Sequence, residues 1–223
     1  ISFLRIQLDD KNSLIQSSIA NDEKEQQLVN WELNKLRMKI QIDKFNFISQ
    51  IEFPNFLREI PSDFCRGMKN LQQITIPLST HTICEGAFRD CIKLKEIILP
   101  PTIIEIHDNA FRGCNSLSKI LLPNSVSKIG KFCFSYCSSL LHITIPPSVM
   151  LISDYLFDHC TSLIEISLPS GVKYIGQHAF ENCCSLESFE LPSALERIGK
   201  GAFSFCNSIL HVEIPSSVSV IEE

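Results

Sequence analysis

Hydrophobic residues recur along most of the chain in short alternating triplets, and each triplet ends at a proline. Successive prolines are 23 residues apart; in most units an isoleucine follows the proline after six residues, a phenylalanine after eleven and a cysteine after fourteen. A fixed period of this length is typical of a solenoid, in which each unit forms one rung of a stack. The prolines are Pro54, Pro77, Pro100, Pro123, Pro146, Pro169, Pro192 and Pro215.

The triplets predict a parallel β-sheet. A triplet is too short to be stable alone, so we expect triplets of successive units to pair about 4.8 Å apart. The proline ends each strand because it has no N–H for the next ladder bond. Eight such rungs would form a sheet face roughly 34 Å long. The expected strands are Ile51–Phe53, Ile74–Ile76, Ile97–Leu99, Ile120–Leu122, Ile143–Ile145, Ile166–Leu168, Phe189–Leu191 and Val212–Ile214.

The remainder of each unit predicts a return segment. The Ala-Phe stretches, such as residues 85–90, predict one or two helical turns on the outer side of the stack. Their phenylalanines are expected to point inward and to stack on the rings above and below. Gly130, Gly176 and Gly199 directly follow the isoleucine, which predicts a positive φ at these glycines.

Residues 1–50 do not follow the repeat. Residues 3–8 and 36–42 alternate, and residues 21–36 are polar with helix-like apolar spacing, so we expect strand, helix and strand. A small α+β cap would cover the first strand edge of the solenoid. An independent functional module is the alternative. The predicted domains are therefore a capping segment, 1–50, and a repeat array, 51–223, with about seven repeats and an incomplete last one.

Over residues 51–223 the unit I-x-I-P-x-S-V-x-x-I-G-x-x-A-F-x-x-C-x-S-L resembles the BspA-type (Treponema-type) leucine-rich repeat. The first unit departs from it, because Phe64, Cys65 and Met68 replace the usual Ala-Phe and cysteine. The resemblance implies a curved α/β solenoid with the parallel sheet on its concave face and short helical turns on the convex side. Members of this family are described as surface adhesins and host-interaction proteins, and none is implied to be an enzyme.

Composition narrows the classes of function. The net charge of −5 and the pI near 5.7 argue against a nucleic-acid surface, which would be basic. No apolar run is long enough for a membrane span. The ten cysteines fit core positions better than a disulfide framework, and no Asn-x-Ser/Thr sequon occurs. These features favour a cytoplasmic setting, whereas the resemblance suggests the cell surface as the alternative.

No catalytic, metal or cofactor site is predicted. Cysteines spaced by one repeat rise along a solenoid like a ladder and do not surround a point, so we expect buried thiols. His142 and His211 lie three rungs apart, about 14 Å, and the other histidines occupy other repeat positions. The chain has no nucleophile elbow or phosphate-binding glycine loop. An enzyme with its chemistry in residues 1–50 or in another domain is the rival class, but fifty residues are few for an active site and a core.

The candidate site is the exposed side of the predicted sheet. Side chains alternate across a strand, so the middle residue of each triplet and the residue two places earlier face solvent. Ile98 and Leu121 are adjacent apolar residues in this column. They are either scattered surface hydrophobes or the centre of a patch that binds a protein partner. The expected surround of this patch is Glu96, Lys119, His142, Thr144 and Glu165.

The last rung gives a further expectation. The strand expected at Val212–Ile214 would leave an open edge, where either further residues complete the solenoid or two molecules associate end to end. Taken together, the sequence predicts a non-catalytic module that binds a protein partner on its concave face. A surface or adhesion-type protein is one form of this hypothesis, and an intracellular scaffold or regulatory subunit is the other.

Overall fold

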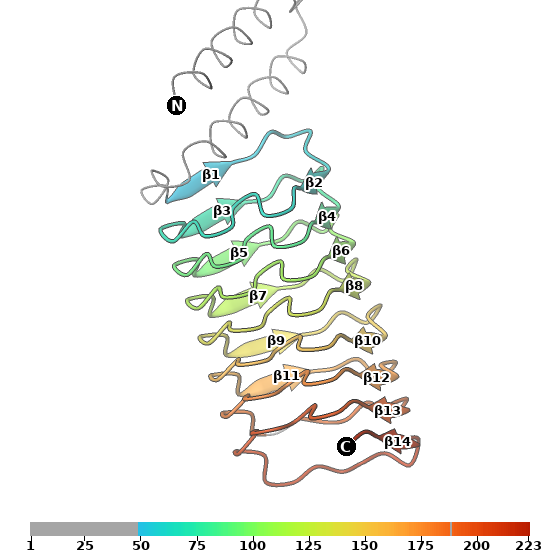
Figure 1. The fold of residues 1–223 in the computed structure, drawn as a ribbon. Helices are drawn as coiled ribbons and strands as arrows, with labels where there is room; N and C mark the ends of the chain where they lie inside the picture. Colours follow the sequence, from blue (N-terminus) through green and yellow to red (C-terminus); the bar gives the residue numbers. More distant parts are fainter. Residues whose placement is uncertain (1–48, 188) are drawn as a thin grey trace, which may run out of the picture. The chain divides into compact units, whose positions relative to one another are not determined.

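The computed structural model describes residues 49–187 and 189–223, which belong to one compact unit, Asn46–Glu223. The chain forms a stack of rungs, one for each 23-residue repeat (Figure 1). All strands pair in parallel, so the predicted parallel-sheet solenoid is confirmed. The strands and helix predicted between residues 3 and 42 lie outside the described residues.

A six-stranded sheet runs along one side of the stack, in the order β1-β3-β5-β7-β9-β11. Paired residues are 23 apart, as in the pair Ile97 and Ile120, so the repeat length sets the register. Each strand begins one residue earlier than predicted and ends before the residue that precedes proline. The strands are β1 (Gln50–Glu52), β3 (Gln73–Thr75), β5 (Glu96–Ile98), β7 (Lys119–Leu121), β9 (His142–Thr144) and β11 (Glu165–Ser167).

The last two predicted strands are not present in the described part of the chain. Residues 189–191 and 212–214 have no strand pairing, so the expectation of eight paired rungs is wrong. Phe189 stands where the six paired strands carry isoleucine. Its ring packs against Phe203 at 5.0 Å and Phe180 at 6.2 Å between centroids. The larger side chain therefore changes the core packing at the point where the regular sheet ends.

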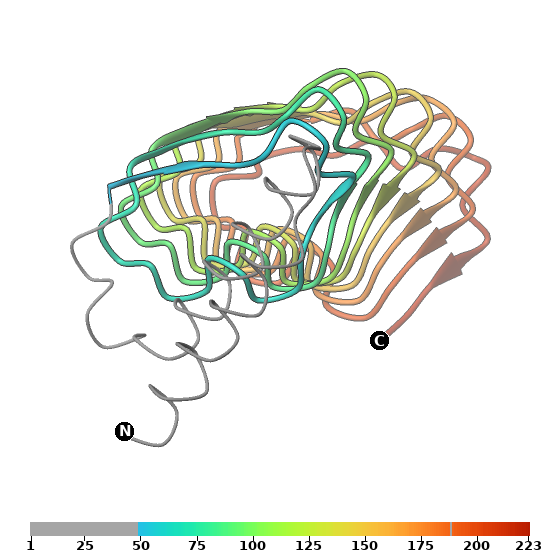
Figure 2. The ribbon, with the colours of Figure 1, turned by 90° about the horizontal axis from the view of Figure 1, so that it is seen from above.

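Two-residue strands form two further sheets along a second side of the stack, where Figure 2 shows their arrows one behind another. In most rungs the N–H that follows the strand donates to the isoleucine carbonyl of the preceding rung. At the break between the two sheets, the Ser153 hydroxyl donates to the Ile129 carbonyl instead, at 2.5 Å. The strands are β2 (Glu59–Ile60), β4 (Thr82–Ile83), β6 (Glu105–Ile106), β8 (Lys128–Ile129), β10 (Leu151–Ile152), β12 (Tyr174–Ile175), β13 (Arg197–Ile198) and β14 (Val220–Ile221).

The core is a column of phenylalanine rings, as the sequence predicts. Neighbouring rings from Phe88 to Phe203 lie 5.3–5.6 Å apart and within 12° of parallel. The five rings from Phe88 to Phe180 are fully buried. Burying one such side chain contributes roughly 1.5–3 kcal/mol, so the column is a major source of stability. Its members are Phe88, Phe111, Phe134, Phe157, Phe180 and Phe203.

The return segment is a ladder of turns, and the predicted helical turns are wrong for the described residues. The Phe88 N–H donates to the Ala110 carbonyl of the next rung, at 2.8 Å, and not to a carbonyl within its own segment. Gly86 and Asp90, which flank this segment, have φ values of 60–61°, which an α-helix does not contain. We call this side of the stack the turn ladder; it comprises residues 63–67 and the segments that follow at 23-residue intervals.

Two positions of the turn ladder have positive φ in every rung from the first to the seventh. Non-glycine residues adopt this conformation at a cost of roughly 1–2 kcal/mol, which Asn and Asp reduce by local hydrogen bonding. The first three rungs carry only Gly, Asp or Asn there, but the next two carry aromatic rings and histidine. The first position is Asp63, Gly86, Asn109, Phe132, Tyr155, His178 and Gly201; the second is Gly67, Asp90, Gly113, Tyr136, His159, Asn182 and Phe205.

These strained rings stack on one another. Phe132 lies 4.5 Å from Tyr155, and Tyr155 lies 4.9 Å from His178, between ring centroids. Tyr136 and His159 form a second stack at 4.4 Å. Ring stacking contributes about 0.5–1.5 kcal/mol per pair, which offsets much of the cost of the left-handed backbone.

The glycines after the isoleucine have a different role from the predicted one. Gly130, Gly176 and Gly199 do not have positive φ. A Cβ on Gly176 would lie 2.5 Å from the backbone nitrogen of Asp154 and 2.7 Å from the carbonyl carbon of Ser153. Glycine is therefore favoured here because adjacent rungs approach closely, and not because of φ.

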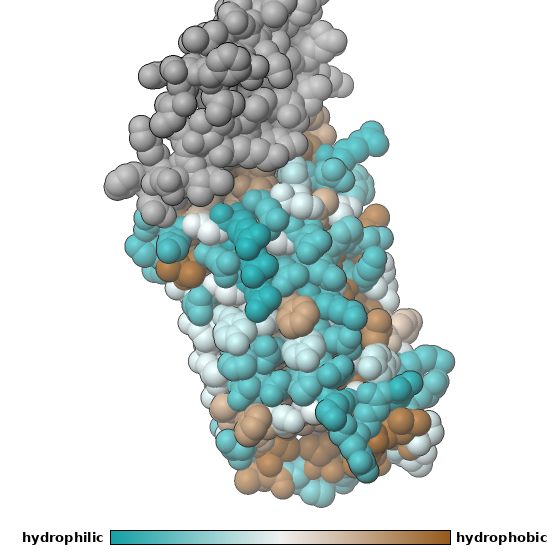
Figure 3. Space-filling model, viewed as in Figure 1, coloured by the Kyte–Doolittle hydropathy of each residue, from teal (hydrophilic) through white to brown (hydrophobic). Residues whose placement is uncertain are grey.

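The end of the stack that holds β14 exposes apolar side chains. Figure 3 shows hydrophobic surface gathered at this end, whereas the remaining coloured surface in that view is a mosaic of polar and apolar residues. Leu210 is 94% exposed, and Ile214 and Ile221 are also exposed. End-to-end association through this edge stays a prediction.

Candidate functional site: the outer face of the six-stranded sheet

Ile98 and Leu121 lie on the solvent side of the six-stranded sheet, as the sequence predicts. Each is the last residue of its strand, β5 or β7, and the two are direct partners in the pairing of these strands. The middle residue of each strand is buried, which leaves the side chains before and after it outside. Ile98 is 72% exposed and Leu121 is 65% exposed. Two large aliphatic side chains therefore stand side by side in water.

The fold does not require apolar residues at these two positions. The equivalent residues in neighbouring strands are Thr75, Thr144 and Ser167, and all three are exposed. Removing apolar surface from water yields about 25 cal/mol per Å², so an exposed pair gains stability only when something covers it. The pair is therefore unexplained by the packing of the solenoid itself.

The predicted surround is found on the same face. Glu96, Lys119 and His142 are the exposed first residues of three successive strands and are paired in register. Glu165 follows in β11, and its carboxylate lies 3.7 Å from the His142 imidazole. Thr144, the last residue of β9, is exposed next to Leu121 in the repeat order. The sheet thus brings together all seven residues of the predicted patch.

Two further exposed apolar residues lie at the edge of this face and were not predicted. Leu141 and Ile164 directly precede β9 and β11 and are 40% and 37% exposed. A hydrogen bond of 3.0 Å from the Ile164 N–H to the Leu141 carbonyl places them in adjacent rungs. Their position in the repeat is polar in the rungs before and directly after them, as at Lys95 and Glu187, and Leu210 occupies it in the last rung. Comparing the residue that directly precedes the strand in each repeat would have found them.

The cysteine column is a set of proton-bearing thiols that are buried, as the sequence predicts, except in the last rung, where Cys206 is partly buried. Its members are Cys91, Cys114, Cys137, Cys160, Cys183 and Cys206. Each Sγ donates to a carbonyl of the preceding rung at 3.0–3.2 Å, for example Cys137 to Phe111. Burial raises the pKa of Cys137 from 9.0 to about 12. Burial likewise raises the pKa of Cys114 and Cys160 well above the usual value. These thiols do not supply thiolate near neutral pH, which is the reactive form of cysteine.

The raised thiol pKa values predict a loss of stability at alkaline pH. Because the folded pKa of Cys137 exceeds the unfolded one, its contribution is present below pH 9 and is lost as pH rises toward 12. Replacing Cys137 with serine should make the fall in unfolding free energy above pH 9 shallower by about 1.4 kcal/mol per pH unit. Urea denaturation at pH 7 to 10.5 measures this slope. Cys184→Ser, at an exposed cysteine, is the control and should leave the slope unchanged.

Within residues 49–187 and 189–223, no three or more His, Cys, Asp or Glu side chains are grouped so that they could hold a metal ion. In the same residues, no helix has the length and apolar character needed to cross a bilayer.

The fold and this exposed sheet face define a leucine-rich-repeat-type solenoid. The family model for the BspA type leucine rich repeat region matches six copies, over residues 38–163 and 128–223. The chain therefore belongs to the BspA-type leucine-rich repeat family. No curated protein matches the chain in sequence.

Solved structures agree with this assignment. A leucine-rich repeat protein from Bacteroides ovatus is 30% identical, with a TM-score of 0.75 over 78% of this chain and 48% of its own. A leucine-rich repeat protein of T. pallidum is 33% identical, with a TM-score of 0.67 over 72% of this chain and 78% of its own. A leucine rich cell surface protein from Faecalibacterium prausnitzii is 28% identical, with a TM-score of 0.67 over 74% and 47%. The chain thus spans about half the length of the Bacteroides ovatus protein.

Proposed function

We propose that the chain is a non-catalytic interaction module that binds a protein partner on the outer face of the six-stranded sheet, the expected concave face. The observation that carries the proposal is the Ile98–Leu121 pair, apolar and exposed where other rungs are polar. Protein interfaces commonly combine an apolar centre with a polar rim. Glu96, Lys119 and Glu165 supply such a rim around the pair. Leucine-rich repeat proteins are generally interaction modules, which supports the same reading.

Two settings for this binding remain, each with one supporting observation. The Faecalibacterium prausnitzii relative is a cell surface protein, which favours a surface or adhesion-type role. All ten cysteines are unpaired, which favours an intracellular scaffold or regulatory subunit, since disulfides form in oxidising compartments. Immunostaining of intact against permeabilised cells separates the two settings.

Replacing Ile98 and Leu121 together with glutamate should abolish capture of the partner. Apolar residues at the centre of an interface often contribute 2 kcal/mol or more, so we expect affinity to fall at least about thirtyfold. The free energy of unfolding should change little, because both side chains are already exposed. Pull-down from the native lysate, followed by titration of the captured protein, measures the effect.

The matched control places the same substitutions on another face. Met150 and Leu151 are adjacent exposed apolar residues, 54% and 46% exposed, beside and within the short strand β10. The variant Met150→Glu with Leu151→Glu should capture the partner as the wild type does. Normal capture by the Ile98 and Leu121 variant would show that the partner binds elsewhere.

A further inference from the structure

Acidic residues continue the line of the six-stranded sheet toward the end of the stack that holds β14. Four exposed glutamates lie in β11 and in the two rungs beyond it. Glu187 is placed beside β11 by a hydrogen bond from its N–H to the Ile164 carbonyl, at 3.3 Å. Glu190 and Glu213 repeat the position of the exposed Ser167 at intervals of 23 residues. We call these residues the acidic strip: Glu165, Glu187, Glu190 and Glu213.

The charges of this face are poorly neutralised by the protein itself. Glu187 and Glu190 form no ion pair with any other described residue. The ion-pair partners within reach of the strip are two histidines: His142 lies 3.7 Å from Glu165, and His211 lies 3.9 Å from Glu213. No lysine or arginine of the described chain pairs with the strip. The strip therefore presents net negative charge to solvent.

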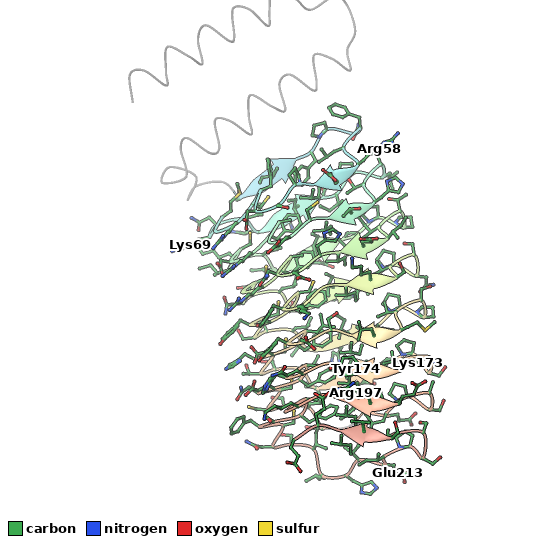
Figure 4. All side chains as sticks on the ribbon, turned by 45° about the vertical axis from the view of Figure 1, so that its right-hand side comes forward. Arg58, Lys69, Lys173, Tyr174, Arg197 and Glu213 are labelled. Carbon is green, nitrogen blue, oxygen red and sulfur yellow. The ribbon has the colours of Figure 1, made fainter. Side chains whose placement is uncertain are left out.

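Charges are neutralised on the side of the stack that carries the short strands. Charged side chains next to these strands pair from rung to rung: Lys131 lies 2.9 Å from Asp154, and Lys173 lies 2.9 Å from Glu196. Arg197 pairs with Glu222 and lies over the Tyr174 ring, 5.8 Å from its centroid. Figure 4 shows Lys173, Tyr174 and Arg197 together on this side. The solenoid can thus pair lysine or arginine with carboxylates of adjacent rungs, and it does not do so along the acidic strip.

The acidic strip adjoins the apolar residues of the same face. Ile98 and Leu121 lie in β5 and β7, and Leu141 and Ile164 lie in the next two rungs. The hydrogen bond that joins Glu187 to Ile164 makes the apolar residues and the strip neighbours. A ligand that covers the apolar residues therefore reaches the glutamates in the following rung.

We propose that the partner docks on this face through an extended polypeptide segment that carries apolar side chains and, beyond them, lysine or arginine. The apolar side chains cover Ile98 and Leu121, and the basic side chains pair with the acidic strip. This inference rests on the proposed function and adds the chemistry of the partner. Complementary charge next to an apolar contact gives an interface its register and its choice of partner.

The spacing of the partner's residues follows from the spacing of the rungs. Leu121 and Glu190 are three rungs apart, which is about 14 Å at 4.8 Å per rung. An extended chain advances about 3.3 Å per residue, so about four residues span this distance. Residues four apart in an extended chain point to the same side. An apolar residue and a basic residue at i and i+4 can therefore both face the sheet.

Three fluorescein-labelled synthetic peptides test the inference with the complete chain. Each peptide has serine at every second position. The positions between the serines hold two leucines and then two test residues, which are lysine in the first peptide, serine in the second and glutamate in the third. We expect the lysine peptide to bind about tenfold more tightly than the serine peptide, and the glutamate peptide to bind most weakly. Fluorescence anisotropy measures the affinities. The advantage of the lysine peptide should shrink between 50 and 500 mM NaCl, because salt screens exposed charges.

Two variants of the protein assign this advantage to the strip. Glu187→Gln with Glu190→Gln should lower affinity for the lysine peptide about fivefold to tenfold and leave the serine peptide unchanged. Glu105→Gln with Glu196→Gln is the matched control, because these glutamates lie on the short-strand side and pair with Lys128 and Lys173. This control should bind all three peptides as the wild type does.

The outcomes separate this inference from the proposed function. Equal affinity for the lysine and serine peptides, or no binding of any peptide at millimolar concentration, overturns the inference and leaves the proposed function standing. Loss of binding in Ile98→Glu with Leu121→Glu supports both. Undiminished binding of the uncharged serine peptide by that variant overturns both, because the leucines would then not contact Ile98 and Leu121.

Discussion

Replacing Phe134 with alanine is expected to lower the free energy of unfolding by about 3–5 kcal/mol, the usual range for a buried aromatic residue. The ring lies in the middle of the phenylalanine column, 5.6 Å from both Phe111 and Phe157, and it is fully buried. Its removal leaves a cavity between two rungs whose spacing is held by backbone hydrogen bonds on several sides. The neighbouring rings therefore have little freedom to collapse into the cavity. Urea denaturation followed by circular dichroism measures the loss.

Phe205→Ala is the control for this experiment. Phe205 is 62% exposed and has positive φ, so alanine removes little buried surface and no favourable backbone geometry. We expect a change of no more than about 0.5 kcal/mol. If both alanine variants lost the same stability, the phenylalanine column would not be the main apolar core of the stack.

Replacing Gly176 with valine is expected to cost at least about 3 kcal/mol, at or above the upper end of the range for overpacking. A Cβ at Gly176 would lie 2.5 Å from the Asp154 nitrogen, and a backbone atom cannot move aside as a flexible side chain can. The rungs would have to separate there, although the Gly176 N–H also donates to the Ile152 carbonyl at 2.7 Å. Valine adds two methyl groups to this clash. The midpoint of thermal unfolding should fall markedly.

Gly171→Val tests whether the close approach of rungs, and not glycine in general, is the cause. A Cβ at Gly171 meets only the end of the Met150 side chain, at 3.0 and 3.6 Å, and Met150 is exposed and flexible. We expect less than about 1 kcal/mol of destabilisation. A similar loss in both variants would mean that the cost reflects valine itself and not contact between rungs.

The repeat makes the strand register and the two sides of the six-stranded sheet predictable. Once triplets 23 residues apart are paired, the alternation of side chains places Ile97 inside and Ile98 outside without further information. The phenylalanine column follows in the same way, because the rungs from Phe88 to Phe203 repeat one arrangement of the ring. Long-range contacts in this molecule are therefore read from sequence spacing, which is seldom possible in a globular domain.

The turn ladder was not predictable by the same means. An Ala-Phe stretch has no feature that distinguishes a short helix from consecutive turns when local propensity is the guide. The signal was the Gly, Asp or Asn at two positions of the first rungs, such as Gly86 and Asp90. Phe132 and Tyr136 hide it, because such residues rarely adopt positive φ. Averaging the repeats therefore concealed the backbone conformation that every rung shares.

The prediction of positive φ at the glycines after the isoleucine was wrong because glycine is favoured for two different structural reasons. Positive φ and close backbone approach both favour it, and the sequence does not distinguish between them. Three other rungs carry a side chain at the equivalent position, so neither a positive φ nor a lack of space is required in every rung; these residues are Cys84, His107 and Ser153.

Leu141 and Ile164 were missed by the site prediction for another reason. They precede their strands, and the alternation rule was applied only to the strand and the residues in phase with it.

The stacked rings of the turn ladder make neighbouring rungs dependent on one another. Phe132 occupies an unfavourable backbone conformation that its contact with Tyr155 offsets, and Tyr155 in turn depends on His178. The effect of a substitution at one of these positions is therefore set by the residue one repeat away. Such positions should covary between related sequences, with glycine or asparagine tolerated alone and large rings found more often in consecutive repeats than singly.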